Sequence, residues 1–216
     1  MKDVKREDFL LYAITDRSWL GSERLYDQVK KALEGGITCL QLREKDCPKE
    51  EVIRTARELK PLCDRYHVPL IINDSVEIAL ECDADGVHLG QKDMQLSQAR
   101  QLLGPDKIIG VSARTVEQAR LAKEQGADYL GVGAVFPTNT KKDAVAITNE
   151  TIQDIRQAVD LPVVAIGGIS EQNVKKLQGS GIDGIAVISA IFAKEDITGA
   201  ARNLKQLVKE VIEKKE

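Results

Sequence analysis

Cationic and amide side chains alternate with other residues in the segment Gln41-Leu42-Arg43-Glu44-Lys45. Residues two apart in a β-strand share a face, so Gln41, Arg43 and Lys45 would lie on one side and Leu42 on the other. A polar, cationic face of this kind indicates an anion site, because buried charge needs a partner. Ion pairs at the rim of a sheet are the alternative role for the two cations.

Two aspartates follow the next two apolar runs of the chain. Asp74 comes directly after Asn73 at the end of run 70–72, and Asp93 follows run 87–89 after a short loop. Neighbouring parallel strands lie roughly 4.8 Å apart, so the two carboxylates would converge at one edge. Such a pair suits Mg²⁺, which takes a few protein oxygens and completes its shell with phosphate oxygens and water. A helix N-cap for Asp74 and a turn for Asp93 are the alternatives.

Paired glycines and a hydroxyl follow the last two apolar runs, at Gly167, Gly168 and Ser189. Glycine lets backbone N–H groups approach a phosphate closely, so the pair indicates a phosphate site. A tight turn explains one glycine more easily than two. The loop 137–143 carries hydroxyl and basic side chains, which suit either the same phosphate or an ordinary solvated loop.

Three other polar residues lie near these strand ends. Ser112 is either a ligand contact or a core hydroxyl, and spacing does not separate the two. His88 could donate a hydrogen bond to a neighbouring ligand group, but a single strand histidine is more often a satisfied core residue. Arg114 shares the face of Ser112 and either adds a cation or points along the rim.

The elements that must position these residues are eight short apolar runs, at 10–14, 38–42, 70–72, 87–89, 108–111, 130–135, 163–166 and 185–188. They are mostly unbroken rather than alternating, which is typical of parallel strands buried on both faces. Helical periodicity fills the intervals, as in 52–62 and 197–211, so each strand is predicted to be followed by a helix. A capping box at 115–118 and glycines at 35, 36, 126, 179 and 181 mark helix starts and ends.

Eight such units without a composition break predict an α/β fold, a (β/α)8 TIM barrel in which residues 1–216 form a single domain. A doubly wound sheet is the alternative. Its dinucleotide fingerprint is absent, because the one candidate, 131–136, has Phe136 where the third glycine should stand. In a barrel the functional residues gather at the C-terminal ends of the strands.

Composition narrows the function. The formal net charge is -3, so no strong field favours nucleic acid or an anionic membrane as a partner, and small molecules are the expected partners. Two histidines exclude a zincin motif, and the four cysteines have no CxxC spacing and are predicted to be reduced thiols. The charged N-terminus and the lack of a long apolar segment predict a cytoplasmic protein. Self-association stays open.

The chain resembles the thiamine phosphate synthase family over nearly its whole length. Motifs in the right order at the strand ends carry the resemblance, and together they are specific although each alone is weak: 12–16 (YAITD), 41–45 (QLREK), 73–74 (ND), 88–93 (HLGQKD), 110–112 (GVS), 137–143 (PTNTKKD) and 166–169 (IGGI). One departure is Arg114, where many members of the family have histidine.

The resemblance implies that the protein joins hydroxymethylpyrimidine diphosphate to hydroxyethylthiazole phosphate, giving thiamine monophosphate and pyrophosphate with Mg²⁺ as cofactor. It assigns the pyrimidine diphosphate to Gln41, Arg43, Lys45, Asn73, Ser112 and Lys141, and Mg²⁺ to Asp74 and Asp93. It assigns the thiazole phosphate to Thr138, Thr140, Gly168, Ile188 and Ser189. Leu42, Glu44 and Asn139 are further expected substrate-binding residues. Arg43, Lys45, Ser112 and Lys141 are the expected catalytic residues.

Two rival functions share parts of this pattern. A thiazole tautomerase resembles the synthase but moves a proton and does not need the two aspartates, so Asp74 and Asp93 favour the synthase. A non-catalytic phosphate-binding relative could keep Gly167 and Gly168 while losing the diphosphate residues, which are complete here. The synthase also explains the lack of a catalytic histidine, since a thiazole nitrogen has a free lone pair and needs no general base.

Overall fold

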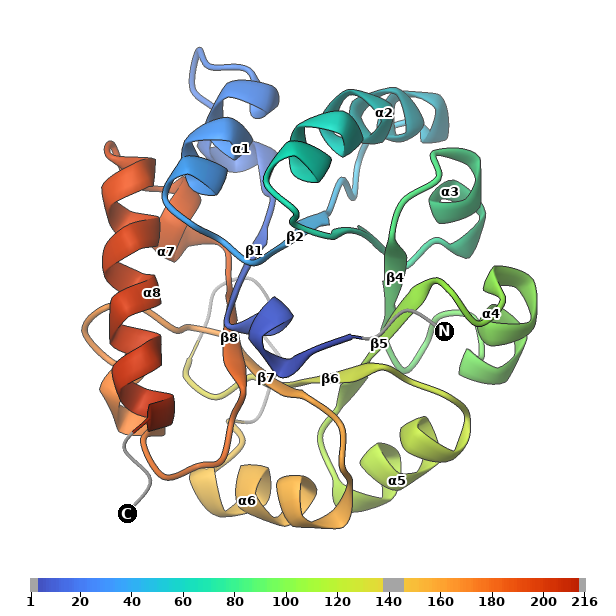
Figure 1. Cartoon of the computed structure of the whole chain (residues 1–216), viewed down its shortest axis with the longest axis vertical. Coiled ribbons are helices and arrows are strands. Elements are labelled where there is room, and N and C mark those ends of the chain that lie inside the picture. Colours follow the sequence, from blue (N-terminus) through green and yellow to red (C-terminus); the bar gives the residue numbers. More distant parts are fainter. Residues whose placement is uncertain (1–3, 138–145, 214–216) are drawn as a thin grey trace.

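The computed structural model describes residues 4–137 and 146–213, and within them eight parallel strands close into a barrel in sequence order. Helices surround the ring of strands (Figure 1), so the TIM-barrel prediction is confirmed. The strands are β1 Leu11–Ile14, β2 Cys39–Leu42, β3 Leu70–Asn73, β4 Gly86–Leu89, β5 Ile108–Ala113, β6 Tyr129–Gly133, β7 Val163–Ile166 and β8 Gly184–Val187. All eight predicted apolar runs overlap one of these strands.

The helices cover the outside of the barrel. They are α1 Leu25–Glu34, α2 Lys49–Arg65, α3 Val76–Glu81, α4 Leu96–Leu103, α5 Val116–Glu124, α6 Asn149–Ala158, α7 Ser189–Phe192 and α8 Ile197–Glu213, with short 3-10 turns η1 Arg6–Phe9, η2 Arg17–Trp19 and η3 Val174–Leu177. The expectation that every strand is followed by an α-helix is wrong at one place, because only η3 follows β7. None of the helices in the described part of the chain is long and apolar enough to cross a membrane.

Two apolar layers hold the barrel, since each strand is buried on both faces. The outer layer lies between strands and helices and includes Leu42 and Leu59. The inner layer fills the barrel with Tyr12, Ile71 and Tyr129 among others. This double burial explains why the strand sequences are unbroken apolar runs rather than alternating ones.

Local signals begin α5 and end α1 and α5 as predicted, although the Gln118 side chain accepts the Arg114 N–H rather than the Thr115 N–H of a capping box, and Gly179 and Gly181 follow the 3-10 turn η3. Thr115 is the N-cap of α5, where its side chain accepts a hydrogen bond from the Gln118 N–H. Gly35 is the C-cap of α1, and Gly126 follows the end of α5 at a φ of 91°, a backbone conformation that glycine adopts without strain. All four cysteines are free thiols, and burial raises the pKa of Cys63 to about 12.

The N-terminal end of the barrel carries a repeated latch at every even strand. The residue before the strand donates its backbone N–H to a carbonyl of the preceding odd strand, at 2.8 to 2.9 Å, and its side chain accepts the N–H of the same residue, at 2.7 to 2.9 Å. The four pairs are Thr38 with Leu11, Asp85 with Leu70, Asp128 with Ile109, and Asp183 with Val163. A net contribution of about 1 kcal/mol for each side-chain bond makes this a stabilising ring.

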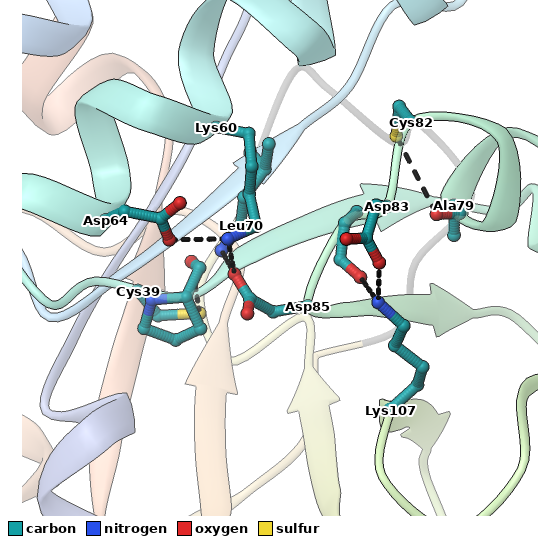
Figure 2. A network of polar contacts seen from close by, with 11 residues as sticks. Cys39, Lys60, Asp64, Leu70, Ala79, Cys82, Asp83, Asp85 and Lys107 are labelled. Carbon is teal, nitrogen blue, oxygen red and sulfur yellow. Dashed lines mark hydrogen bonds and ion pairs between the residues drawn. The ribbon is translucent and has the colours of Figure 1, made fainter.

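Each aspartate of the latch has a cation beside it. Lys60 lies 3.5 Å from Asp85, as Figure 2 shows from close by, and Arg100 lies 2.6 Å from Asp128. Arg6 lies 2.7 Å from Asp183 and belongs to η1, which crosses the middle of the ring of strands in Figure 1. The aromatic ring of Phe9, also in η1, packs on Tyr129 with centroids 4.3 Å apart. Charge pairing and packing therefore close this end of the barrel.

Candidate active site

A cavity of about 410 Å³ opens at the C-terminal ends of the strands, as a barrel fold predicts. Every strand contributes to its lining: Tyr12 and Ile14 from β1, Gln41 from β2, Asn73 from β3, His88 from β4, Ser112 from β5, Gly131 and Gly133 from β6, Val164 and Ile166 from β7, and Ala186 and Val187 from β8. A second cavity of about 740 Å³ adjoins it and shares Arg43, Lys45 and Gly168 with it. Two adjoining compartments can hold two ligands side by side.

Most predicted site residues meet in the first cavity. Those that line it are Gln41, Arg43, Lys45, Asn73, Asp74, Asp93, Ser112, Gly168, Ile188 and Ser189. The side chain of Leu42 instead faces the helices, and the buried carboxylate of Glu44 binds Arg17, so neither lies in the lining. Thr138, Asn139, Thr140 and Lys141 lie outside the described residues.

The cationic side of the cavity is formed by the loop after β2. Among the described residues, Arg43 makes one ion pair, with Asp16 at 3.8 Å, and Lys45 makes none. The Arg43 backbone N–H donates to the Thr15 hydroxyl at 2.9 Å, which fixes the start of the loop. Rim ion pairs therefore do not account for both cations, and their charge is left to attract an anion.

The acidic side is formed by Asp74 and Asp93. The pKa of Asp74 is raised, first by burial and then by repulsion from Asp93. Asp74 is not the helix N-cap, because Ser75 caps α3. It is held at a φ of 64°, an uncommon conformation for a residue other than glycine, by a 2.8 Å bond from its N–H to the His88 carbonyl.

Asp93 does stabilise a turn, which was the alternative role predicted for it, because one of its carboxylate oxygens accepts the Gly90 N–H at 2.6 Å. The two carboxylates nevertheless lie close enough to interact. No group of three or more histidine, cysteine or acidic side chains suitable for a metal occurs among the described residues. Two adjacent carboxylates fit a hard divalent cation that takes its remaining ligands from phosphate and water, so the donor set suits Mg²⁺.

Gly168 and Ser189 form what we call the phosphate corner. They belong to the same cavity lining as the acidic pair. Gly167 and Gly168 have φ values of 101° and 66°. A Cβ on Gly168 would lie 2.4 Å from the Pro137 carbonyl oxygen, so only glycine fits this approach. The Asn173 amide donates to the Gly168 carbonyl at 2.8 Å and holds the turn. A backbone fixed in this way leaves room for an oxyanion beside it.

A hydrogen-bonded line of side chains crosses the floor of the cavity. The Gln41 amide donates to the Tyr12 hydroxyl at 2.8 Å, and Tyr12 contacts the Tyr129 hydroxyl at 2.8 Å. His88 Nδ1 lies 2.9 Å from the Tyr129 hydroxyl, and His88 Nε2 lies 3.0 Å from the Ser112 hydroxyl. Burial raises the pKa of both tyrosines well above the ordinary value, so their hydroxyls keep their protons.

The sequence reasoning missed Tyr129 and gave no role to Tyr12. The signal that could have located Tyr129 is glycine within strands. A Cβ on Gly110 would lie 2.0 Å from the Tyr129 ring, and one on Gly131 would lie 2.9 Å from the His88 ring. Gly131 belongs to the segment 131–136, which lacks a complete dinucleotide fingerprint. Its role is instead to make room for the His88 ring inside the barrel.

Among the other lining residues are three with long polar side chains, Gln91, Lys92 and Arg114. Gln91 and Lys92, from the loop after β4, are lining residues, and the Gln91 amide donates to the Ser112 carbonyl at 2.6 Å. Arg114, an exposed residue just after β5, also borders the cavity. These side chains add positive charge and hydrogen-bond donors near Ser112.

Comparisons with known proteins agree over most of the chain. The family model described as thiamine monophosphate synthase matches residues 11–191. A thiamine-phosphate synthase of Clostridium tetani is 50% identical over 200 residues, covering 93% of this chain and 96% of the relative. One of Alkaliphilus oremlandii is 47% identical over 209 residues, covering 97% of this chain and 100% of the relative.

Two solved structures are similar to this chain. A thiamine phosphate pyrophosphorylase from Pyrococcus furiosus superposes with a TM-score of 0.87 at 42% identity, covering 95% of this chain and 98% of that chain. A structure described as native KDPGal superposes with a TM-score of 0.71 at 14% identity, covering 99% of this chain and 100% of that chain. At that identity the second likeness concerns the fold alone.

Proposed function

This chain belongs to the thiamine monophosphate synthase family, and we propose that it joins hydroxymethylpyrimidine diphosphate to hydroxyethylthiazole phosphate in the paired cavities. It is a thiamine-phosphate synthase, a transferase of thiamine biosynthesis. The observation that carries the site assignment is the position of Asp74 and Asp93 in one lining with Arg43 and Lys45, next to the phosphate corner at Gly168. That arrangement suits a metal-assisted diphosphate beside a second phosphate.

The reaction breaks the bond between the pyrimidine methylene carbon and the diphosphate oxygen, and it forms a bond between that carbon and the thiazole nitrogen. The diphosphate leaves with the electron pair of the broken bond. Arg43 and Lys45 neutralise the charge that develops on the leaving oxygen. Asp74 and Asp93 would hold Mg²⁺, which would supply further charge neutralisation there. Lys141 is proposed to assist, although it lies outside the described residues.

Gln41, Asn73 and Ser112 hold the pyrimidine ring, and the phosphate corner holds the thiazole phosphate. Leu42 and Glu44 contribute through backbone position, since their side chains face away from the cavity. Thr138, Asn139 and Thr140 complete the thiazole phosphate site in this proposal. Holding both substrates in line replaces a bimolecular encounter with a step inside one complex.

A tautomerase is the second candidate, and the cavity does not favour it. Proton transfer near neutral pH suits histidine, whereas Arg114 stays protonated and cannot accept a proton. His88 has both ring nitrogens in hydrogen bonds to Tyr129 and Ser112. The acidic pair, which a proton transfer of this kind does not need, is present.

The remaining predictions concern cofactor, partners and location. We propose Mg²⁺ as the cofactor, small molecules as the only partners, neither nucleic acid nor membrane among them, and the cytoplasm as the place of action. The formal net charge of -3 supports the part of this proposal that leaves out nucleic acid and anionic membranes. Residues 1–216 are proposed to act as a single domain, and a homo-oligomer is compatible with this proposal.

Incubation of the purified protein with both substrates tests the proposal. Thiamine monophosphate and pyrophosphate should appear in equal amounts with Mg²⁺ and should stop forming when a chelator is added. Omission of either substrate should abolish both products. Formation of a tautomerised thiazole carboxylate phosphate without pyrophosphate release from the coupling substrates would instead establish the tautomerase.

A further inference from the structure

A line of hydrogen bonds beneath the cavity joins two of the three side chains that are proposed to hold the pyrimidine, Gln41 and Ser112. It begins at Gln41 in β2, continues through Tyr12 in β1, Tyr129 in β6 and His88 in β4, and ends at Ser112 in β5. Its middle is tightly packed, since Tyr12 is 1% exposed and Tyr129 is fully buried. We call these five residues the relay. No role for its three central residues follows from the function proposed above.

With the Gln41 amide nitrogen facing the Tyr12 hydroxyl, the hydrogens of the relay have one well-satisfied arrangement. The Gln41 N–H can only donate, so the Tyr12 oxygen accepts it and the Tyr12 O–H is free to donate to the Tyr129 oxygen. The Tyr129 O–H then donates to His88 Nδ1, which leaves the imidazole proton on Nε2. That N–H donates to the Ser112 oxygen. Every hydrogen along this direction has an oxygen or nitrogen acceptor.

The reverse direction is poorer. If the Tyr129 O–H donated to Tyr12 instead, the Tyr12 oxygen would accept two hydrogen bonds and its own hydrogen would need another partner. Among the described residues the Cys39 thiol also neighbours that hydroxyl, and sulfur is a weak acceptor. A poorly placed hydroxyl hydrogen in a fully buried site is costly, so the forward direction is favoured.

The forward direction decides what the cavity offers to a ligand. The Gln41 nitrogen is committed to Tyr12, so the amide oxygen is left to accept a hydrogen bond from the ligand. The Ser112 oxygen already accepts from His88, so its O–H is left to donate. The relay thus presents an acceptor at one side of the ring and a donor at the other.

We propose that Tyr12, Tyr129 and His88 are positioning residues that make the cavity select an aminopyrimidine over its oxo counterpart. An aminopyrimidine carries an amino donor and ring-nitrogen acceptors, which match the oxygen of Gln41 and the hydroxyl of Ser112. An oxo analogue places an acceptor where the amino donor stood, so it meets the amide oxygen of Gln41 and leaves buried polar groups unpaired. This inference rests on the proposed function, because it takes the pyrimidine to lie between Gln41 and Ser112.

Calorimetric titration with the aminopyrimidine diphosphate and its oxo analogue, in Mg²⁺, tests the proposal. The wild-type protein should bind the amino compound roughly 100-fold more tightly. In Tyr12→Phe the Gln41 amide can turn over, so this ratio should fall about 10-fold, whereas the affinity for the thiazole phosphate should not change. Tyr66→Phe, which changes an exposed tyrosine at the C-terminal end of α2, is the matched control and should keep the wild-type ratio.

His88 allows a rescue experiment. His88→Leu frees Ser112 and should lower the ratio, and His88→Gln should restore it, because the glutamine oxygen can accept from Tyr129 while its nitrogen donates to Ser112. A looser fold would weaken both ligands alike and leave the ratio unchanged. Ratios within twofold of wild type in both Tyr12→Phe and His88→Leu would overturn the proposal.

A spectroscopic measurement on His88 in the wild-type protein tests the proposal even if the variants fail to fold. The chain has two histidines, so ¹⁵N spectra of wild type and His67→Gln assign His88 directly. The shifts should be those of a neutral imidazole protonated at Nε2, and protonation at Nδ1 would overturn the proposal. This measurement needs no substrate. Failure of the wild-type protein to release pyrophosphate would instead refute the proposed function.

Discussion

Aspartates stand beside the strands at both ends of this barrel, and their surroundings are opposite. At the N-terminal end, Asp128 accepts a strand N–H and lies 2.6 Å from the Arg100 guanidinium. At the C-terminal end, Asp74 lies against Asp93, and this repulsion together with burial raises its pKa. The first kind of carboxylate is satisfied by the fold itself. The second kind needs something from outside, which is what a binding site requires.

The comparison predicts that stability and activity separate between the two ends. Asp74→Asn and Asp93→Asn should each lower the rate of coupling by roughly 100-fold or more, because each removes a proposed metal ligand. Their free energies of unfolding should stay the same or rise by about 1 kcal/mol, since a repulsion is relieved. Steady-state kinetics and urea unfolding measure the two quantities. Strong destabilisation with wild-type turnover would reverse the assignment of the two ends.

Asp128→Ala makes the corresponding test at the N-terminal end of the barrel. It leaves the Ile109 N–H without its acceptor and removes one partner of the Arg100 guanidinium, which still donates to the Gly104, Lys107 and Gly126 carbonyls, and it should cost about 1–3 kcal/mol of unfolding free energy. Coupling activity of the folded fraction should be close to wild type. Asp154→Ala, on an exposed position of α6, is the control and should change stability by less than about 0.5 kcal/mol. Equal losses in the two variants would remove the latch as a stabilising feature.

A smaller effect is expected within the C-terminal end. Gly168→Ala places a Cβ against the Pro137 carbonyl and should weaken binding of the thiazole phosphate roughly 10-fold, with little change for the diphosphate. Gly179→Ala is the matched control, because Gly179 also has a positive φ, of 78°, but nothing lies within 4 Å of the added atom. Calorimetry of each ligand distinguishes the two variants. Normal thiazole phosphate binding by Gly168→Ala would contradict the division of the cavity.

The smallest expected effect concerns Arg114. Arg114→His should keep coupling activity but weaken binding of the diphosphate substrate by roughly 2- to 5-fold at low salt. The difference should shrink as added salt screens the interaction. Titration at two ionic strengths measures it. An effect that does not depend on salt would mean that Arg114 acts through packing rather than charge.

The two ends also differ in how much the sequence revealed. The mouth of the barrel could be predicted because several strand ends place a polar side chain after an apolar run, as at Asp74 and Ser112. The relay could not, since a hydrogen bond between Tyr12 and Tyr129 joins residues 117 positions apart. Spacing along one strand carries no information on which interior side chains meet across a barrel.

The latch residues are part of a repeated sequence pattern that was not used to predict them. Three of its residues follow a glycine by two positions, as in Gly36-Ile37-Thr38, Gly126-Ala127-Asp128 and Gly181-Ile182-Asp183, and these glycines have φ values of 92°, 91° and 81°. At the fourth, Asp83 takes the place of glycine at a φ of 51°. The glycines were interpreted only as helix ends. Their equal distance from a polar residue is the repeat that predicts a shared structural role.

The metal requirement of pyrophosphate release tests the central claim most directly, namely that the unneutralised carboxylates at the C-terminal end are the ones that serve the reaction. Initial rates should be measured against Mg²⁺ concentration for wild type, Asp93→Asn and Asp128→Asn with both substrates saturating. The account predicts that Asp93→Asn needs far more Mg²⁺ and is only partly restored by it, while folded Asp128→Asn follows the wild-type curve. Wild-type rates for Asp93→Asn in chelated buffer would contradict the account.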